Sequence, residues 1–218
     1  MDQFDGIEKK KLKGTTTVAI VCTDGVVMGA DTRATGGTFI ASQDVRKVWK
    51  IDNNLAMTIA GGVGDAQELI RTLKAQNEIY KMNEDKPLSP KSANSLLSII
   101  LQGNKMFPYE VQLMVAGMDG DEPQLYNLDF YGGYVSESKF SATGSGSLTA
   151  YGYLEDMYKK GVTTKEAVKG VARALQIAMR RDAATGGDMI IAVITKSGYT
   201  EYTGAELEKV IAAPAKGK

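Results

Sequence analysis

Three consecutive threonines, Thr15 to Thr17, follow a polar opening segment and offer a cluster of hydroxyl groups. An acid, Asp31, closes the second predicted strand, and a lysine, Lys47, lies in the third. The chain contains no histidine, which excludes Ser-His-Asp and Cys-His mechanisms and His-ligated zinc or iron. A hydroxyl nucleophile would therefore need Lys, Asp, Glu, Tyr or a terminal amine as its base.

Two other groups carry weaker signals. Cys22 is the only cysteine, and its apolar surroundings favour a buried, inert thiol in a reducing compartment. A glycine cluster at residues 61–64 precedes a predicted helix, where a phosphate-binding loop would lie. The cluster lacks the Lys-Ser/Thr of a P-loop and the G-x-G-x-x-G spacing. We therefore expect no nucleotide, no other cofactor and no metal.

Length and charge narrow the class of protein. A chain of 218 residues favours one large domain over two small ones. The 26 basic and 26 acidic residues balance, so bulk charge does not indicate a nucleic-acid partner or a polybasic membrane surface. No apolar run reaches the ~18–20 residues of a transmembrane helix, and residues 1–14 have no signal-peptide core. We expect a cytoplasmic protein with no nucleic-acid or membrane partner.

The elements that must position these groups begin with two hairpins. Residues 15–23 and 26–31 are rich in β-branched and apolar types and flank a tight-turn signal. Residues 46–52 and 55–61 form a second pair of the same kind. Both pairs favour antiparallel strands.

Two helices are predicted next, from an N-cap at Asp65 to about residue 79 and from Ser89 to a break near Gly103 or Pro108. The remaining elements are predicted in this order: strands at 110–119 and 123–130, two short strands, helices at 148–160 and 164–181, and a hairpin at 188–202. This order predicts an α+β fold in which two mainly antiparallel sheets are each faced by a helix pair.

Strand alternation also indicates a pocket. Val45, Lys47 and Trp49 would share one face of the third strand, as would Ile59 and Gly61 on the fourth. Apolar side chains would therefore flank the lysine, although each apolar residue taken alone fits a plain core equally well.

Five separated motifs resemble one known family: GTTTVAIVCTDGVVMGADTRAT, VRKVWKI, MTIAGGVGDAQEL, ATGSGS and RRDAATGGD. In order and spacing they are similar to the β subunit of the proteasome core particle, especially the archaeal type. The resemblance covers nearly the whole chain after Gly14. It implies the four-layer αββα sandwich of the N-terminal-nucleophile hydrolases, which agrees with the predicted element order.

The resemblance implies a threonine endopeptidase that is made as an inactive precursor. Residues 1–14 would be a propeptide removed by self-cleavage between Gly14 and Thr15, and residues 15–218 would be the catalytic domain. Thr15 would then be the mature N-terminus, its hydroxyl the nucleophile and its freed α-amine the base. An α-amine suits this role because its usual pKa of about 7.7–8.0 is close to operating pH.

Five further positions match the family's catalytic machinery. The charge of Lys47 would lower the pKa of the terminal amine, and Asp31 would pair with that lysine. Ser145 and Asp182 would steady the amine. The backbone N–H of Gly61 would donate to the oxyanion.

The resemblance completes the pocket for the side chain on the acyl side of the cut bond by adding Ala34 and Val63. It also assigns backbone pairing with an extended substrate to Thr35, Gly61 and Val63. Because this set contains no charged residue to receive a basic or acidic side chain, we expect cleavage after large apolar residues.

The implied partners are other β subunits in a ring, rings of α subunits, an ATPase unfoldase and unfolded polypeptide substrates.

One position departs from the family: Thr185 stands where serine is frequent, which keeps the hydroxyl and adds a methyl group. Two alternatives to the endopeptidase are a noncatalytic structural β-type subunit and an amidase of the same broad fold. The bacterial two-component protease subunit and the proteasome α subunit fit less well, because the first has less similar segments and the second lacks a processed threonine.

Overall fold

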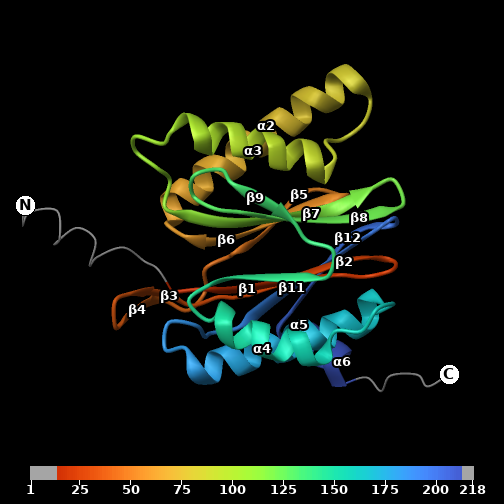
Figure 1. Cartoon of the computed structure of the whole chain (residues 1–218). Coiled ribbons are helices and arrows are strands. Elements are labelled where there is room, and N and C mark those ends of the chain that lie inside the picture. The colour runs from red at the N-terminus through yellow and green to blue at the C-terminus, as the bar shows by residue number, and fades with distance from the viewer. Residues whose placement is uncertain (1–13, 213–218) are drawn as a thin grey trace, which may run out of the picture.

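Two antiparallel sheets of five strands lie face to face in the computed structural model, which describes residues 14–212 (Figure 1). The first sheet contains β1 (Thr16–Val21), β2 (Gly25–Asp31), β10 (Phe140–Gly144), β11 (Met189–Thr195) and β12 (Gly198–Thr203), in the order β10-β1-β2-β11-β12. The second contains β5 (Val48–Asp52), β6 (Leu55–Gly61), β7 (Val111–Asp119), β8 (Glu122–Leu128) and β9 (Tyr134–Ser136), in chain order. A separate two-stranded sheet pairs β3 (Ala34–Gly36) with β4 (Phe39–Ser42).

Helices cover the outer face of each sheet, so the molecule has four layers (Figure 1). The helices α2 (Val63–Glu84) and α3 (Pro90–Gly103) pack on the second sheet. The helices α4 (Ser147–Met157) and α5 (Thr164–Arg181) pack on the first, and α6 (Gly204–Ala212) follows β12. The predicted α+β sandwich of mainly antiparallel sheets flanked by helix pairs is confirmed.

Three apolar clusters hold the layers together. One lies between the two sheets and includes Met28 and Met114, and the other two lie between each sheet and its helices. Every residue of β2 is buried, because helices cover one face of its sheet and the second sheet covers the other. This double cover explains why the strand reads as a continuous apolar run rather than as an alternating one.

The predicted helix starts differ in accuracy. The predicted start of α3 near Ser89 is confirmed, and the Ser89 hydroxyl caps this helix by accepting the N–H of Ser92 at 3.1 Å. The prediction that Asp65 caps α2 was wrong, because that helix already begins at Val63. The Asp65 carboxylate instead accepts the N–H of Glu110 at 2.8 Å. This hydrogen bond joins the first turn of α2 to the loop before β7. The spacing of residues in the local sequence does not predict this contact.

Some elements were not predicted or were misplaced. The hairpin of β3 and β4 and the helix α6 were absent from the sequence prediction. Lys47 was placed within the third strand, whereas β5 begins at Val48. Residues 43–47 are irregular, and the amide of Val45 donates to the carbonyl of Thr32 at 2.8 Å rather than to a neighbouring strand of the sheet.

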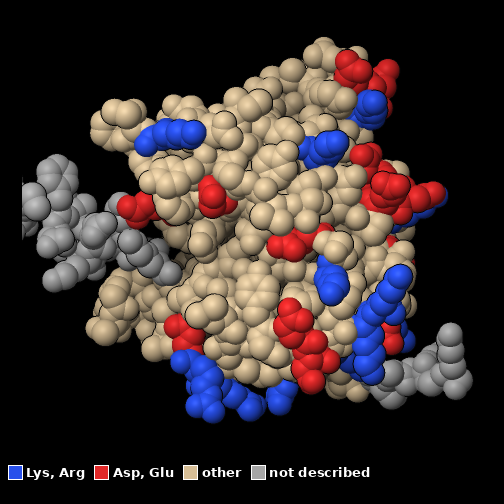
Figure 2. Space-filling view, viewed as in Figure 1, with Lys and Arg blue, Asp and Glu red and all other residues tan. Residues whose placement is uncertain are grey.

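The distribution of surface charge does not indicate a particular class of binding partner. On the face shown in Figure 2, acidic and basic side chains are interspersed, in keeping with equal numbers of both signs in the chain. Within residues 14–212, no helix is long and apolar enough to cross a membrane.

The helix α5 packs closely on the strand β2 at Gly29. Asp31 is the last residue of β2, and Asp182 directly follows α5. Gly29 allows the approach, since a Cβ built at this position would lie 2.5 Å from Cγ1 of Val171 and 3.2 Å from Cγ1 of Ile191. A glycine in β2 therefore permits the close packing of α5 on this strand.

We expect Gly29→Ala to destabilise the protein by about 1–3 kcal/mol, because overpacking forces neighbours to move. The measurement is the unfolding midpoint by circular dichroism in a denaturant series. Gly152→Ala is the matched control, since a Cβ on this exposed α4 position meets nothing within 4 Å. It should leave stability unchanged or raise it by up to about 1 kcal/mol. Equal midpoints for the two variants would contradict the proposed close contact.

Candidate active site

A buried ion pair lies where β2 ends. Nζ of Lys47 donates to Oδ1 of Asp31 at 2.8 Å, and both side chains are nearly inaccessible to solvent. The same Oδ1 accepts the N–H of Thr16 at 2.9 Å. The other oxygen, Oδ2, accepts the N–H groups of Arg33 at 3.1 Å and Gly186 at 2.9 Å. Each carboxylate oxygen therefore has two donors, and the acid joins four separate stretches of chain.

Lys47 is satisfied as an ammonium ion. Besides Asp31, its Nζ donates to the carbonyl oxygens of Arg33 at 2.5 Å and Gly14 at 3.1 Å. Three acceptors match the three donors that only the charged form has. Burial lowers the pKa of Lys47 below its ordinary value, while the charge of Asp31 opposes that shift.

The Gly14–Thr15 peptide bond is intact and lies against this lysine. Oγ1 of Thr15 donates to the Gly14 carbonyl oxygen at 2.5 Å, so that oxygen has both the hydroxyl and the Lys47 ammonium as donors. The nitrogen of Thr15 is an amide here and lies 3.4 Å from Oγ of Ser145. An amide nitrogen is not basic, so this form of the chain has no α-amine at the site.

Hydroxyl groups connect Thr15 to a second acid. Oγ of Ser145 lies 3.2 Å from the Thr15 carbonyl oxygen and donates to Oδ2 of Asp182 at 2.5 Å. The Thr185 hydroxyl donates to the same oxygen at 2.5 Å and lies 2.7 Å from the Thr16 hydroxyl. The structure thus brings Ser145, Asp182 and Thr185 together beside Thr15, although they come from the β10–α4 and α5–β11 connections.

Asp182 is held in its ionised form. Partial burial alone would raise its pKa, but hydrogen bonds from Ser145, Thr185 and the backbone N–H of Ala184, together with the charge of Lys47, outweigh burial. The pKa of Asp182 is consequently below its ordinary value. The hydroxyl of Ser145 is therefore oriented with its proton toward this acid.

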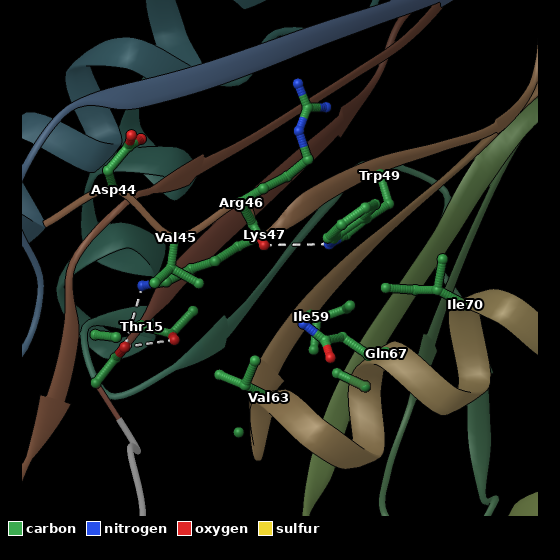
Figure 3. A pocket seen from close by; sticks show the side chains of 14 residues that line it. Thr15, Asp44, Val45, Arg46, Lys47, Trp49, Ile59, Val63, Gln67 and Ile70 are labelled. Atoms are coloured by element: carbon green, nitrogen blue, oxygen red, sulfur yellow. Dashed lines mark hydrogen bonds between the residues drawn. The ribbon is translucent and has the colours of Figure 1, made fainter. Parts of the chain in front are cut away.

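A cavity of about 310 Å³ opens beside Thr15 (Figure 3). Five predicted pocket residues line it: Ala34, Val45, Trp49, Ile59 and Val63. Lys47 and Gly61 also line it, so one cavity contains the lysine and the apolar positions. Thr35 does not line this cavity; its Oγ1 lies 2.2 Å from the position that a Cβ on Gly14 would take.

Gly61 ends β6 at the boundary between two hollows. It borders the pocket beside Thr15 and a second cavity of about 550 Å³ that also reaches Ser145. Its φ of +119° is accessible to glycine but strained for other residues, and a Cβ would collide with the carbonyl oxygen of Glu110. The strand end therefore presents bare backbone between the two cavities.

Among the described residues, no group of three or more His, Cys, Asp or Glu side chains could hold a metal ion. Cys22 is buried in the core between the first sheet and its helices. Burial, with smaller effects from nearby acids, raises the pKa of its thiol to about 12. A thiol with this pKa is protonated at neutral pH and is a poor nucleophile.

Comparison with known proteins agrees with this geometry. A family profile described as proteasome subunit matches residues 12–194, which is most of the chain. The chain belongs to the proteasome subunit family.

Similar proteins include archaeal proteasome β subunits. The proteasome subunit beta of Methanohalophilus mahii is 46% identical over 202 residues, covering 93% of this chain and 96% of that protein. The proteasome subunit beta of Methanococcus vannielii is 46% identical over 211 residues, covering 96% of each. That of Methanosarcina barkeri is 44% identical over 204 residues, covering 94% and 97%. The resemblance to archaeal-type proteasome β subunits is confirmed.

Sequence reasoning missed part of this proteasome subunit's pocket. Ala66 and Ile70 line it from α2, and their spacing of four places them on one helical face. Asp44 and Arg46 line it as well, so the expectation of a pocket without charged residues was wrong. Figure 3 shows the ends of both charged side chains directed away from Ile59.

We expect Asp31→Asn to lower the free energy of unfolding of this proteasome subunit by about 3–5 kcal/mol, because it removes one member of a buried ion pair. Either orientation of the new amide also turns its NH₂ toward two N–H donors. The measurement is a denaturant series followed by circular dichroism. Asp121→Asn is the control, because Asp121 pairs with Lys196 at 2.6 Å on the surface and both side chains are exposed. A similar loss in the two variants would contradict a special role for the buried pair.

Proposed function

We propose that this proteasome β subunit is a threonine endopeptidase that becomes active by cutting its own chain before Thr15. One observation carries the proposal: the hydroxyl of Thr15 and the ammonium of Lys47 both donate to the Gly14 carbonyl oxygen. The chain has no histidine to activate a serine or cysteine. A threonine with a freed α-amine supplies both nucleophile and base from one residue.

The first step in the proposal is attack of Oγ1 of Thr15 on the Gly14 carbonyl carbon. Negative charge then develops on the carbonyl oxygen, where the buried Lys47 ammonium stabilises it. The C–N bond breaks, an ester forms on the threonine, and the hydroxyl proton ends on the released nitrogen. Water hydrolyses the ester, so residues 1–14 leave as a carboxylic acid and residues 15–218 remain as the catalytic domain.

Glycine before the cut is part of this arrangement. A Cβ at Gly14 would collide with Oγ1 of Thr35 and with the carbonyl oxygen of Ala184. A larger residue would therefore push the peptide bond away from Lys47. Residues 1–13 of the proposed propeptide lie outside the described residues.

In the mature chain the α-amine of Thr15 would take the hydroxyl proton, directly or through a water. Ser145, held by the ionised Asp182, would orient the amine, and the nearby Lys47 charge would lower the pKa of that amine. The backbone N–H of Gly61 would stabilise the oxyanion. The acyl-enzyme ester forms as the amine half of the substrate leaves with the transferred proton, and water then releases the acid half.

The pocket favours a large apolar side chain on the acyl side of the cut. Its walls come from Val45, Trp49, Ile59 and Val63, and burying such a side chain gains about 1.5–3 kcal/mol of transfer free energy. Extended polypeptide would pair with backbone at residues 35, 61 and 63 as an added strand. Unfolded chains are therefore the proposed substrates.

We propose assembly with other β subunits in a ring, with α-subunit rings and with an ATPase unfoldase, in the cytoplasm. The names of the similar proteins support assembly with other proteasome subunits. Several large apolar side chains lie exposed on the isolated chain, including Phe39, Met106, Phe107 and Leu148. Exposed apolar surface of this kind is typical of protein contacts.

Thr15→Ala should leave the chain uncut and abolish peptidase activity, because one hydroxyl performs both reactions. The measurements are the intact mass of the subunit and turnover of a Leu-ending fluorogenic peptide, in particles co-purified with their α subunit. Thr23→Ala, at an exposed threonine after β1, is the control and should be cut and active.

Two outcomes would count against the proposal. Loss of residues 1–14 from the Thr15→Ala subunit, with no other protease present, would show that cutting is not autocatalytic. An uncut and inactive wild-type subunit in assembled particles would support the noncatalytic structural role instead.

Peptides ending in Leu, Phe or Tyr on the acyl side should be cut faster than those ending in Arg or Asp. An unpaired charge buried in the pocket would cost roughly several kcal/mol. The measurement is kcat/KM over a set of fluorogenic peptides that differ only in that residue. The fastest cutting after Arg would mean that Asp44 receives the side chain, and the fastest cutting after Asp would assign that role to Arg46.

A further inference from the structure

Trp49 forms the part of the pocket wall that lies away from Thr15 (Figure 3). Its Nε1 donates to the carbonyl oxygen of Arg46 at 3.1 Å. The Arg46 guanidinium lies 5.9 Å from the ring centroid, and Nζ of Lys74 in α2 lies 5.7 Å from it. The indole therefore depends on Arg46 for its hydrogen bond and for one of two cation–π contacts.

Arg46 is held in turn by the C-terminal hairpin. Its Nη1 and Nη2 donate to the two carboxylate oxygens of Glu201 at 2.8 Å and 2.5 Å, a bidentate arrangement. The Tyr199 hydroxyl donates to the same carboxylate at 2.5 Å, and Nζ of Lys50 lies 5.4 Å from the Tyr199 ring. Partial burial would raise the pKa of Glu201, but these hydrogen bonds outweigh it and lower the pKa.

The contact joins the edges of the two sheets. Glu201 lies on β12, the edge strand of the first sheet, and Arg46 lies two residues before β5, the edge strand of the second. Residues 43–47 are irregular, and hydrogen bonds to Thr32 and from the N–H of Ile59 hold their backbone at residues 43, 45 and 47, while Glu201 holds the side chain of Arg46. This short segment nevertheless carries Val45 of the pocket and Lys47 of the ion pair.

We propose that Glu201 is a positioning residue that, through Arg46, fixes the Trp49 wall and sets the preference of the pocket for large over small apolar side chains. The inference rests on the proposed peptidase function. The pair of Arg46 and Glu201 has side chains that are 41% and 20% exposed, so solvent screens part of its electrostatic attraction. Its effect is on the geometry of the wall.

Glu201→Gln tests the proposal in assembled particles, because glutamine keeps the shape but loses the second acceptor for the guanidinium. Trp49 is the only tryptophan in the chain, so a difference in fluorescence between wild-type and variant particles reports on this indole. We expect acrylamide to quench this fluorescence more strongly in the variant. We also expect the ratio of kcat/KM for Leu-ending over Ala-ending peptides to fall by about 3–10-fold, through a higher KM for the Leu-ending peptide, which is the scale of the transfer free energy of about one buried methylene group.

Asp121→Asn is the matched control, because it breaks the exposed ion pair with Lys196 at the turn between β11 and β12 without touching the pocket. It should change neither quenching nor the peptide ratio. Arg46→Lys keeps the positive charge but loses the planar fork, so it should reproduce the effect of Glu201→Gln.

Unchanged quenching in Glu201→Gln would overturn the role of Glu201, whether or not the particle is active. Increased quenching with an unchanged Leu-to-Ala ratio would overturn its role in preference. An inactive wild-type particle would overturn the proposed peptidase function. The quenching result would still decide whether Glu201 fixes the Trp49 wall, so failure of the peptidase function and failure of the role of Glu201 are distinguishable.

Discussion

The rest of the site depends on burying the charges of Asp31 and Lys47 together. Two ions taken out of water are stable only when all their hydrogen-bonding groups are satisfied. Here three backbone N–H groups donate the remaining hydrogen bonds to the carboxylate, and two backbone carbonyls accept the remaining hydrogen bonds of the ammonium. One of those carbonyls belongs to Gly14, so satisfying the lysine also places the peptide bond before Thr15.

The sandwich brings these groups together at one end of its layers. Thr15 precedes β1, Asp31 ends β2, and Gly61 ends β6, while Ser145 and Asp182 lie in connections to the helices. The helix that precedes Asp182 packs closely on the strand that ends at Asp31, at Gly29. Regular elements thus hold these groups from several sides. Within the irregular residues 43–47, hydrogen bonds to Thr32 and Ile59 hold the backbone, and Glu201 holds the Arg46 side chain.

The proposed chemistry depends on whether the peptide bond between Gly14 and Thr15 is intact or cut. While Gly14 and Thr15 are joined, the nitrogen of Thr15 is an amide and the hydroxyl bonds to the carbonyl before it. Cutting that bond would convert the amide into an amine beside Ser145 and Lys47 without any change of fold. Activation of this proteasome β subunit would then be a change in one functional group rather than a rearrangement.

Sequence patterns by themselves determined the hairpins of the two five-stranded sheets, the helix pairs and the start of α3 near Ser89, because strand alternation, helical spacing and turn residues are local properties. Family motifs pointed to Thr15, Asp31 and Lys47, which lie within 33 residues of one another. Only the tertiary structure decided that Asp65 holds Glu110 rather than capping α2, that Lys47 bonds to the Gly14 carbonyl, and that Arg46 is held by Glu201 from 155 residues away. Such contacts depend on how the two sheets stack and on which loops lie next to each other. The periodicity of a short sequence segment does not predict either.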